Sequence, residues 1–97
     1  MPTHKEADTF WRDWALLTRP RRQLFQQAVQ KMTADLKAGK GFRKGLRIKG
    51  VKGHPGIYEM TWADDGRATF SYGISPHRGD THTIWRRIGT HEIFKNP

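Results

Sequence analysis

The chain contains no cysteine among its 97 residues, which excludes disulfide bonds and thiolate metal sites. No apolar run approaches the ~20 residues that span a bilayer, so we expect no membrane partner. Residues 1–9 are polar and lack the apolar segment of a signal peptide, so the cytoplasm is the expected compartment. The length suits one small domain, 1–97, in which residues 1–8 are expected to be flexible.

Acidic residues are also few. The chain has 18 Lys and Arg against 9 Asp and Glu, which gives a formal charge of +9. Such an excess in so short a chain predicts a polyanionic partner, or an acidic protein that neutralises it.

Two helices are expected in the first 40 residues. The first begins after Asp8 or Thr9, either of which can cap it. The segment Thr18-Arg19-Pro20 interrupts it, and Pro20 suits the first turn of a second helix. Gly39 fits the position after that helix ends. The second helix has apolar residues at helical spacing, namely Leu24, Phe25, Ala28, Val29, Met32 and Leu36.

A basic connector, Gly39 to Gly45, follows the second helix. Its backbone N–H groups could cradle phosphates. However, it lacks the Gly-Lys-Ser/Thr ending of a nucleotide-binding loop. We therefore interpret it as a linker between a helix and a strand.

From Leu46 onward the pattern alternates with a period of two, which predicts strands. His54-Pro55-Gly56 suits a type II turn. Asp64-Asp65-Gly66 predicts a three-residue hairpin loop with Gly66 left-handed, which would pair Ala63 with Arg67. A last strand is expected at about 81–88. The predicted fold class is α+β: an N-terminal helical hairpin packed on a twisted, mostly antiparallel four-stranded sheet.

This hairpin would separate two faces. One face is apolar and should pack on the helices; it comprises Tyr58, Met60, Trp62, Ala68, Phe70 and Tyr72. The other face is polar and should meet water or a ligand; it comprises Glu59, Thr61, Arg67, Thr69 and Ser71.

The runs Gly56-Ile57-Tyr58-Glu59-Met60-Thr61-Trp62, Arg67-Ala68-Thr69-Phe70-Ser71-Tyr72 and Ile88-Gly89-Thr90-His91-Glu92-Ile93-Phe94 resemble the RelE/ParE superfamily of bacterial toxins, over roughly residues 9–94. The resemblance implies a toxin that an acidic antitoxin, encoded beside it, silences. Members of the RelE type cut mRNA on the ribosome without a metal or other cofactor. Members of the ParE type instead poison DNA gyrase and have no nuclease chemistry.

The resemblance also implies site residues. Arg67 falls at the arginine that supports the scissile phosphate in the RelE branch. His91 falls where the YafQ branch has a catalytic histidine. Glu59 and Thr61 replace two lysines of RelE, and Glu59 is similar to a possible general base of the YoeB branch. The late catalytic tyrosine has no clear match, so Phe94 is a candidate for stacking on a base. The usual first strand is hard to find before Phe10.

Metal-free RNA cleavage needs a base for the 2′-OH proton, a cation for the charged phosphorane and an acid for the leaving 5′-oxygen. Glu59, Arg67 and His91 provide one group of each kind. Taken singly, Glu59 is better explained as a solvated strand residue paired with a neighbouring Arg or Lys, and Arg67 as a surface strand arginine. His91 follows a strand beside Gly89, where loops expose functional groups, so its functional interpretation is preferred.

Further basic and aromatic residues are expected to contact RNA: Arg43, Lys44, Arg47, Lys49, Lys52, His82, Arg86, Arg87 and Phe94. A metal site at His77 and His82 lacks another clear ligand, so no metal is expected. The leading hypothesis is a toxin with endoribonuclease activity on mRNA. The alternatives are a ParE-like gyrase inhibitor and a catalytically inactive nucleic-acid-binding module of the same fold.

Overall fold

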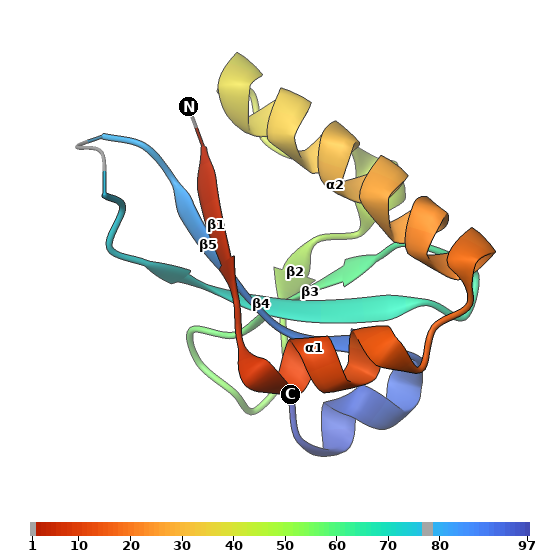
Figure 1. The fold of residues 1–97 in the computed structure, drawn as a ribbon. Coiled ribbons are helices and arrows are strands. Elements are labelled where there is room, and N and C mark those ends of the chain that lie inside the picture. Colours follow the sequence, from red (N-terminus) through yellow and green to blue (C-terminus); the bar gives the residue numbers. More distant parts are fainter. Residues whose placement is uncertain (1, 77–78) are drawn as a thin grey trace.

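A computed structural model describes residues 2–76 and 79–97 of the chain. Its elements follow in chain order (Figure 1): β1 (Thr3–Glu6), α1 (Asp8–Ala15), α2 (Arg19–Ala38), the 3-10 turn η1 (Lys44–Leu46), β2 (Lys49–Gly50), β3 (Tyr58–Thr61), β4 (Arg67–Gly73), β5 (His82–Gly89) and the 3-10 turn η2 (His91–Lys95). No helix in these two ranges is both long enough and apolar enough to cross a membrane.

The sheet has five strands in the order β1-β5-β4-β3-β2. β1 pairs in parallel with β5, and the other neighbours are antiparallel. The expectation of four strands behind a flexible segment 1–8 was therefore wrong. Residues 3–6 are polar and lie at the sheet edge, so they carry no apolar alternation. Backbone hydrogen bonds hold them, including Thr3 N to Thr81 O at 2.9 Å and Ala7 N to Trp85 O at 2.8 Å.

The ends of the helices follow from local chemistry. Thr18 precedes α2 with an extended backbone, and Pro20 lies in its first turn, as expected. Gly39 ends α2 in the left-handed region at φ 68°, and its N–H bonds to the Asp35 and Leu36 carbonyl oxygens. α1 begins at Asp8, and Ala7 precedes it without a side-chain cap.

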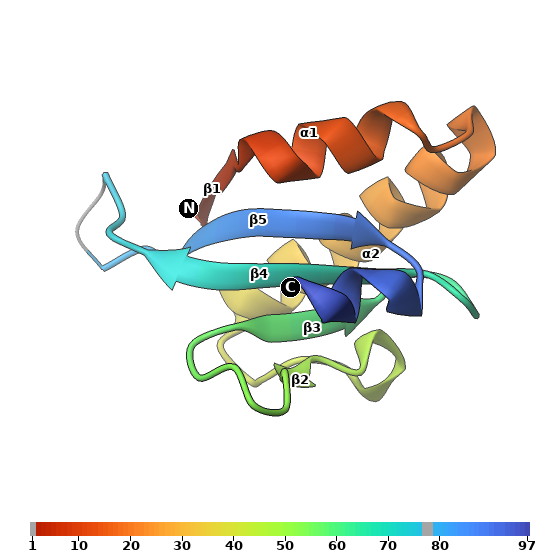
Figure 2. The ribbon, with the colours of Figure 1, turned by 90° about the horizontal axis from the view of Figure 1, so that it is seen from below.

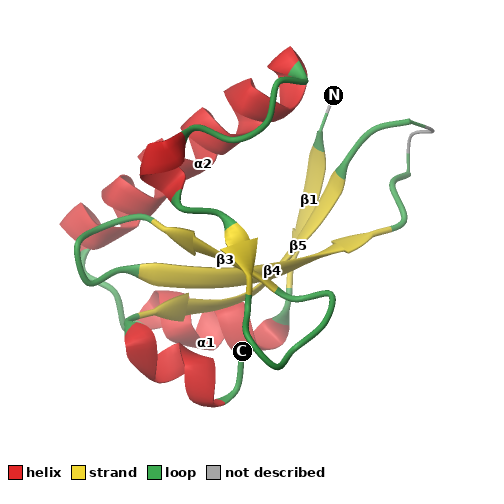
Figure 3. Ribbon diagram, turned by 180° about the vertical axis from the view of Figure 1, so that it is seen from behind, coloured by secondary structure: helices red, strands yellow, loops and turns green. Residues whose placement is uncertain are grey.

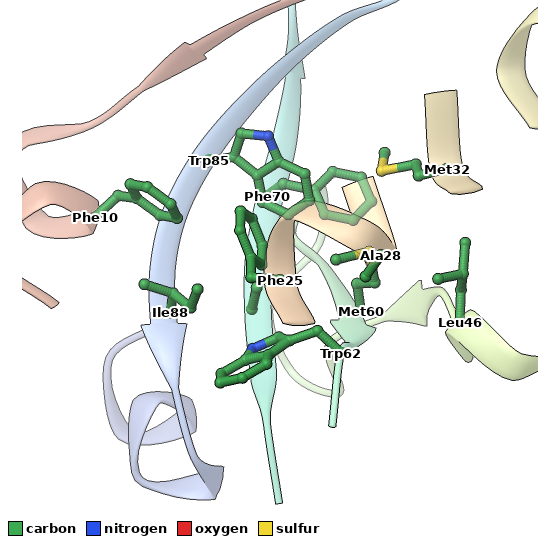
Figure 4. Packing of buried hydrophobic residues seen from close by; sticks show 11 residues of the cluster. Phe10, Phe25, Ala28, Met32, Leu46, Met60, Trp62, Phe70, Trp85 and Ile88 are labelled. Carbon is green, nitrogen blue, oxygen red and sulfur yellow. The ribbon is translucent and has the colours of Figure 1, made fainter. Parts of the chain in front are cut away.

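The two helices pack together on a shared aromatic core, which confirms the α+β class. The ring centroids of Phe10 in α1 and Phe25 in α2 are 5.6 Å apart, and Phe25 meets Trp85 of β5 at 5.1 Å. Figure 4 shows these rings beside Phe70 and Met60, both fully buried. Figure 2 shows that α2 and η2 lie on opposite faces of the sheet. The face opposite the core is therefore partly covered by η2 and otherwise open.

The hairpin of β3 and β4 has the predicted faces but another register. Thr61 pairs with Arg67 and Glu59 with Thr69, two residues away from the predicted pairing. A shift of two leaves each side chain on its predicted face, because the strand period is two. Gly66 is not left-handed. A Cβ at Gly66 would lie 2.6 Å from the Trp62 ring, so close packing on the tryptophan requires glycine there.

The segment between α2 and β3 is mostly loop (Figure 3). The predicted strand from Leu46 was wrong: Leu46 ends η1, Arg47 is left-handed at φ 49°, and β2 spans only Lys49–Gly50. The left-handed backbone at Arg47 interrupts the extended chain, so apolar and basic side chains alternate over residues 46–49 without forming a strand. The turn at His54 is as predicted, with Gly56 at φ 81° and Ile57 N bonded to His54 O at 3.1 Å.

Candidate nucleic-acid interface

Cross-strand pairing aligns the polar side chains in two adjacent rows. Glu59 pairs with Lys49 on one side and with Thr69 on the other, and Thr69 pairs with Arg87. The second row runs from Thr61 through Arg67 to Gly89 at the end of β5, with Arg67 in the middle. We call the face that bears these two rows the polar face.

Glu59 is half-buried in β3. Among the residues that the structure describes, its carboxylate has no hydrogen bond and no ion pair. The nearest cation by sheet register is Lys49, its partner on the exposed edge strand β2.

Arg67 is turned toward the hairpin loop that precedes it. Its Nη1 donates to the carbonyl oxygens of Ala63, Asp64 and Gly66 at 3.2, 3.2 and 2.9 Å. No hydrogen bond occupies Nη2 or Nε within residues 2–76 and 79–97. The guanidinium therefore supports the loop through one nitrogen and keeps two donors for another group.

His91 is exposed at the first position of η2. Its ring meets Phe94 edge to face, with 5.3 Å between centroids. Gly89 lies opposite Arg67 in the register, so His91 follows that row by two residues. No hydrogen bond joins Glu59, Arg67 and His91 to one another in the described part of the chain. The register brings their backbones to one end of the polar face.

Arg86 and Arg87 bond to the last residues rather than projecting freely. The register of β4 and β5 shifts between Thr69 and Phe70, which leaves Arg86 as an extra residue in β5. Arg86 Nε donates to Pro97 O at 3.2 Å, and Arg87 Nη1 donates to Asn96 O at 3.0 Å. The buried Thr69 hydroxyl also donates to Pro97 O, at 2.9 Å. The last residues thus lie over part of the polar face.

Arg43 is also engaged within the fold. Its Nε and Nη2 donate to the Asp35 carboxylate at 3.0 and 2.8 Å, and its backbone N–H donates to the same group at 2.9 Å. The side-chain hydrogen bonds lower the pKa of Asp35 and raise the pKa of Arg43. This pair fastens the connector to the last turns of α2.

The remaining predicted contacts differ in their exposure. Lys44, Arg47, Lys49 and Lys52 are exposed around η1 and β2. His82 is half-buried, and its Nδ1 lies 2.7 Å from Thr3 Oγ1. His77, considered with His82 for a metal, lies outside the described residues. Among the predicted contact residues that the structure describes, those without an ion pair thus lie mainly around η1 and β2, where Lys49 pairs with Glu59.

Two residues near these groups were missed from the sequence. Asp13 of α1 accepts hydrogen bonds from Arg87, and Lys31 of α2 lies near Arg43, whose Nη2 donates to the Lys31 carbonyl oxygen at 3.4 Å. Both occupy polar positions on amphipathic helices, and no sequence signal distinguishes them from other solvated residues. Only the packing of each helix on the sheet brings them to these positions.

Comparison with solved structures identifies proteins of similar fold. A chain of the Escherichia coli DinJ–YafQ toxin–antitoxin complex matches with a TM-score of 0.63 and 12% identity, over 94% of this chain and 93% of that chain. A chain of the RelB–RelE antitoxin–toxin complex from Methanococcus jannaschii matches with a TM-score of 0.62 and 18% identity, over 95% of both chains. A YoeB/ParE toxin from Agrobacterium tumefaciens matches with a TM-score of 0.63 and 12% identity, over 92% of this chain and 98% of that chain.

No protein-family model and no curated protein sequence matches the chain. The structural matches extend over almost the full length of both partners, so the common architecture includes the helical hairpin and the sheet. The chain therefore has the fold of RelE-, YafQ- and YoeB-type toxins, and the resemblance seen in the sequence is confirmed at the level of the fold.

Proposed function

We propose that this protein is the toxin of a bacterial type II toxin–antitoxin system and that it cleaves mRNA in the cytoplasm. The observation that carries the proposal is the strand register on this fold. Glu59 and Arg67 belong to adjacent rows of the polar face, and the turn that bears His91 begins where the Arg67 row ends. A charge of +9 favours binding of a polyanion to such a face.

Each group has a role in the proposed reaction. The Glu59 carboxylate takes the proton of the ribose 2′-OH, and the 2′-oxygen then attacks the adjacent phosphorus. The free donors of Arg67 bind the phosphate oxygens, for which the planar guanidinium is suited. His91 protonates the departing 5′-oxygen, a transfer that suits imidazole because it is an effective general acid. The products are a cyclic phosphate and a free 5′-hydroxyl.

The proposal includes an acidic antitoxin as the partner. Trp11, Leu16 and Leu24 are large apolar residues with exposed fractions of 50%, 85% and 42%. An acidic amphipathic segment would cover these side chains and neutralise nearby arginines of α1 and α2. Opposite charge would also accelerate association. Association with an acidic partner should therefore weaken as salt is added.

Induction of the protein alone, followed by sequencing of RNA ends, tests the activity. We expect growth arrest and new mRNA 5′ ends. Purified protein should also cut mRNA in the presence of a chelator, either free or on ribosomes in a reconstituted translation system. Normal growth with intact messages at high soluble expression would contradict the proposal.

One observation favours a second candidate, a non-enzymatic inhibitor of DNA gyrase. Arg67 already donates to three carbonyl oxygens of its own loop. An arginine that only binds phosphate would not need these hydrogen bonds within the fold. A supercoiling assay with purified gyrase separates the two candidates. Inhibition of gyrase without any RNA cleavage would favour the second.

A further inference from the structure

A concavity of about 500 Å³ opens between α2, η1 and the hairpin loop, at the end of β3. Its walls include core residues: Ala28, Leu46 and Trp62, labelled in Figure 4, line it from the protein side. Four cationic residues also line it: Lys31, Arg43, Arg47 and Arg67. Asp64 is the one acidic residue among the described lining residues.

The cations come from three segments, namely α2, the residues flanking η1, and β4, and two of the four are held in place. Arg43 is fixed by the Asp35 carboxylate, and Arg67 is fixed by the loop carbonyls while Nη2 and Nε remain available. Lys31 and Arg47 are exposed and have no ion pair among the residues that the structure describes. The concavity is therefore a preformed region of positive charge.

The backbone of Arg47 is unusual for a residue with a Cβ: it ends η1 in the left-handed region, with its N–H donating to Lys44 O at 3.0 Å. Its φ of 49° is left-handed, a conformation that costs a residue with a Cβ about 1 kcal/mol or more and that glycine adopts freely. Arg47 is exposed, so burial does not explain an arginine at this position. A side chain kept at an unfavourable backbone position is consistent with a role in binding.

The concavity adjoins the polar face through two shared residues. Thr61 and Arg67 line the concavity and also form the second row of the polar face, next to Glu59. A strand bound on the polar face would reach the concavity across these two residues. An acidic peptide would suit the charge equally well, but this adjacency favours the ligand of the polar face.

We propose that this concavity binds backbone phosphates of single-stranded RNA beside the nucleotide bound on the polar face. The inference rests on the proposed function for the identity of the ligand. Lys31 and Arg47 provide the cations without an ion pair among the described residues, and Arg67 provides its free Nη2 and Nε, whereas the charge of Arg43 is balanced by Asp35. Lys31 and Arg47 contribute affinity and not chemistry, because they bind phosphates beside the scissile one, whereas Arg67 is shared with the polar face.

Two substitutions test the site with little effect on folding. Arg47→Gly removes the charge and suits the left-handed backbone. Lys31→Gln removes the charge on an exposed helical position where glutamine is a good helix former. Lys37→Gln on the same helix and Lys40→Gln in the exposed connector are matched controls, since neither residue lines the concavity. Circular dichroism and thermal unfolding verify the fold of each.

Binding is measured in a His91→Ala background, so that the RNA stays intact. The probe is a labelled single-stranded RNA of about 12 nucleotides, titrated at several salt concentrations. Each test substitution should weaken binding about threefold to tenfold at low salt and reduce the salt slope by about 0.7 per lost phosphate contact. The control substitutions should change the slope by less than half of that amount.

Two further probes distinguish the sources of negative charge. A poly-glutamate peptide tests for an acidic protein ligand, and inorganic phosphate tests for a free anion. If RNA affinity and its salt slope are unchanged in both test variants, the inference is overturned. The proposed function stands in that case as long as the parent protein cleaves RNA. If the two test substitutions weaken the binding of poly-glutamate but not of RNA, the concavity is a protein interface and the inference is overturned. If the test substitutions weaken RNA binding but the parent protein does not cleave RNA, the inference stands and the proposed nuclease activity is overturned.

Discussion

Asp13 and Arg87, which are 74 residues apart in the chain, form a two-point ion pair between α1 and β5. Arg87 Nε lies 2.6 Å from Asp13 Oδ2, and Arg87 Nη2 lies 3.1 Å from Oδ1. The Asp13 carboxylate also accepts the Ile88 backbone N–H at 3.1 Å. These hydrogen bonds raise the pKa of Arg87. Arg87 therefore joins a helix, a strand and the last residues, and its main role is structural.

Removing either partner of this pair should destabilise the fold. The Arg87 side chain is only 25% exposed and that of Asp13 only 14%, so the partner left behind is poorly solvated. We expect Asp13→Ala and Arg87→Ala each to lower the free energy of unfolding by about 2–3 kcal/mol. Urea denaturation of both single variants and the double variant measures the coupling, expected at about 1–3 kcal/mol. Strictly additive losses would show that the pair is not a unit.

Arg67 should affect both stability and cleavage. Arg67→Ala leaves three loop carbonyl oxygens without their donor, which should cost about 1–2 kcal/mol because the loop is partly solvated. Arg67→Lys keeps the charge but not the planar fork, so it should recover part of the stability and little of the cleavage. Denaturation and cleavage rates are measured together. Full stability in the alanine variant would mean that the loop bonds contribute nothing.

His91 gives the opposite pattern, since it is exposed and its described contact is the Phe94 ring. His91→Ala should leave the unfolding midpoint near that of the parent and slow RNA cleavage by about 10²–10⁴-fold. Phe94→Leu, which removes the ring contact and keeps the histidine, measures separately what the Phe94 ring contributes to cleavage. A parent-like cleavage rate in His91→Ala would exclude His91 as the acid.

The sequence predicted the elements that depend on local chemistry. The limits of α2 follow from Thr18, Pro20 and Gly39, and the turn at His54 follows from Pro55 and Gly56. The faces of β3 and β4 were also correct, because alternation fixes the face whatever the register. The register itself depends on how Trp62 packs on Gly66, which is a three-dimensional fact that no residue pattern reports.

Elements held by tertiary contacts were not predictable. β1 has a polar sequence and exists because β5 offers an unpaired edge. The partners of Arg43, Arg67, Arg86 and Arg87 are all acceptors within the fold, although a basic count alone suggests a set of free cations. The sequence therefore indicated the positive charge correctly but not which charges are available to a ligand.

The pair of Asp35 and Arg43 should make stability depend on pH in the acid range. Hydrogen bonds from Arg43 lower the pKa of Asp35 below its usual value of 3.8. A carboxyl group with a lowered pKa in the fold stabilises the protein above its unfolded-state pKa, and this contribution is lost as pH falls through the folded-state pKa. Asp35→Asn should thus be less stable than the parent at about pH 6, and the difference should shrink below about pH 4. A difference that stays constant down to about pH 2 would contradict this linkage.

The hydroxyl of Thr69 should hold the last residues on the polar face. It is fully buried and donates to Pro97 O at 2.9 Å, an oxygen that also accepts from Arg86. Thr69→Val removes one hydrogen bond at nearly constant volume, so the loss of stability should be about 1 kcal/mol. The Asn96 amide, which bonds to Ile93 O, should then exchange its hydrogen faster.

Thr83→Val is the matched control for this substitution. Thr83 is only 4% exposed and lies in β5, and its hydroxyl bonds to no other residue within the described ranges. Its replacement should leave both the stability and the exchange of the Asn96 amide close to those of the parent. Hydrogen exchange measured by NMR compares the two variants directly. If Thr83→Val accelerates exchange at Asn96 as much as Thr69→Val does, then general loosening of the sheet, and not the Thr69 hydroxyl, controls the last residues.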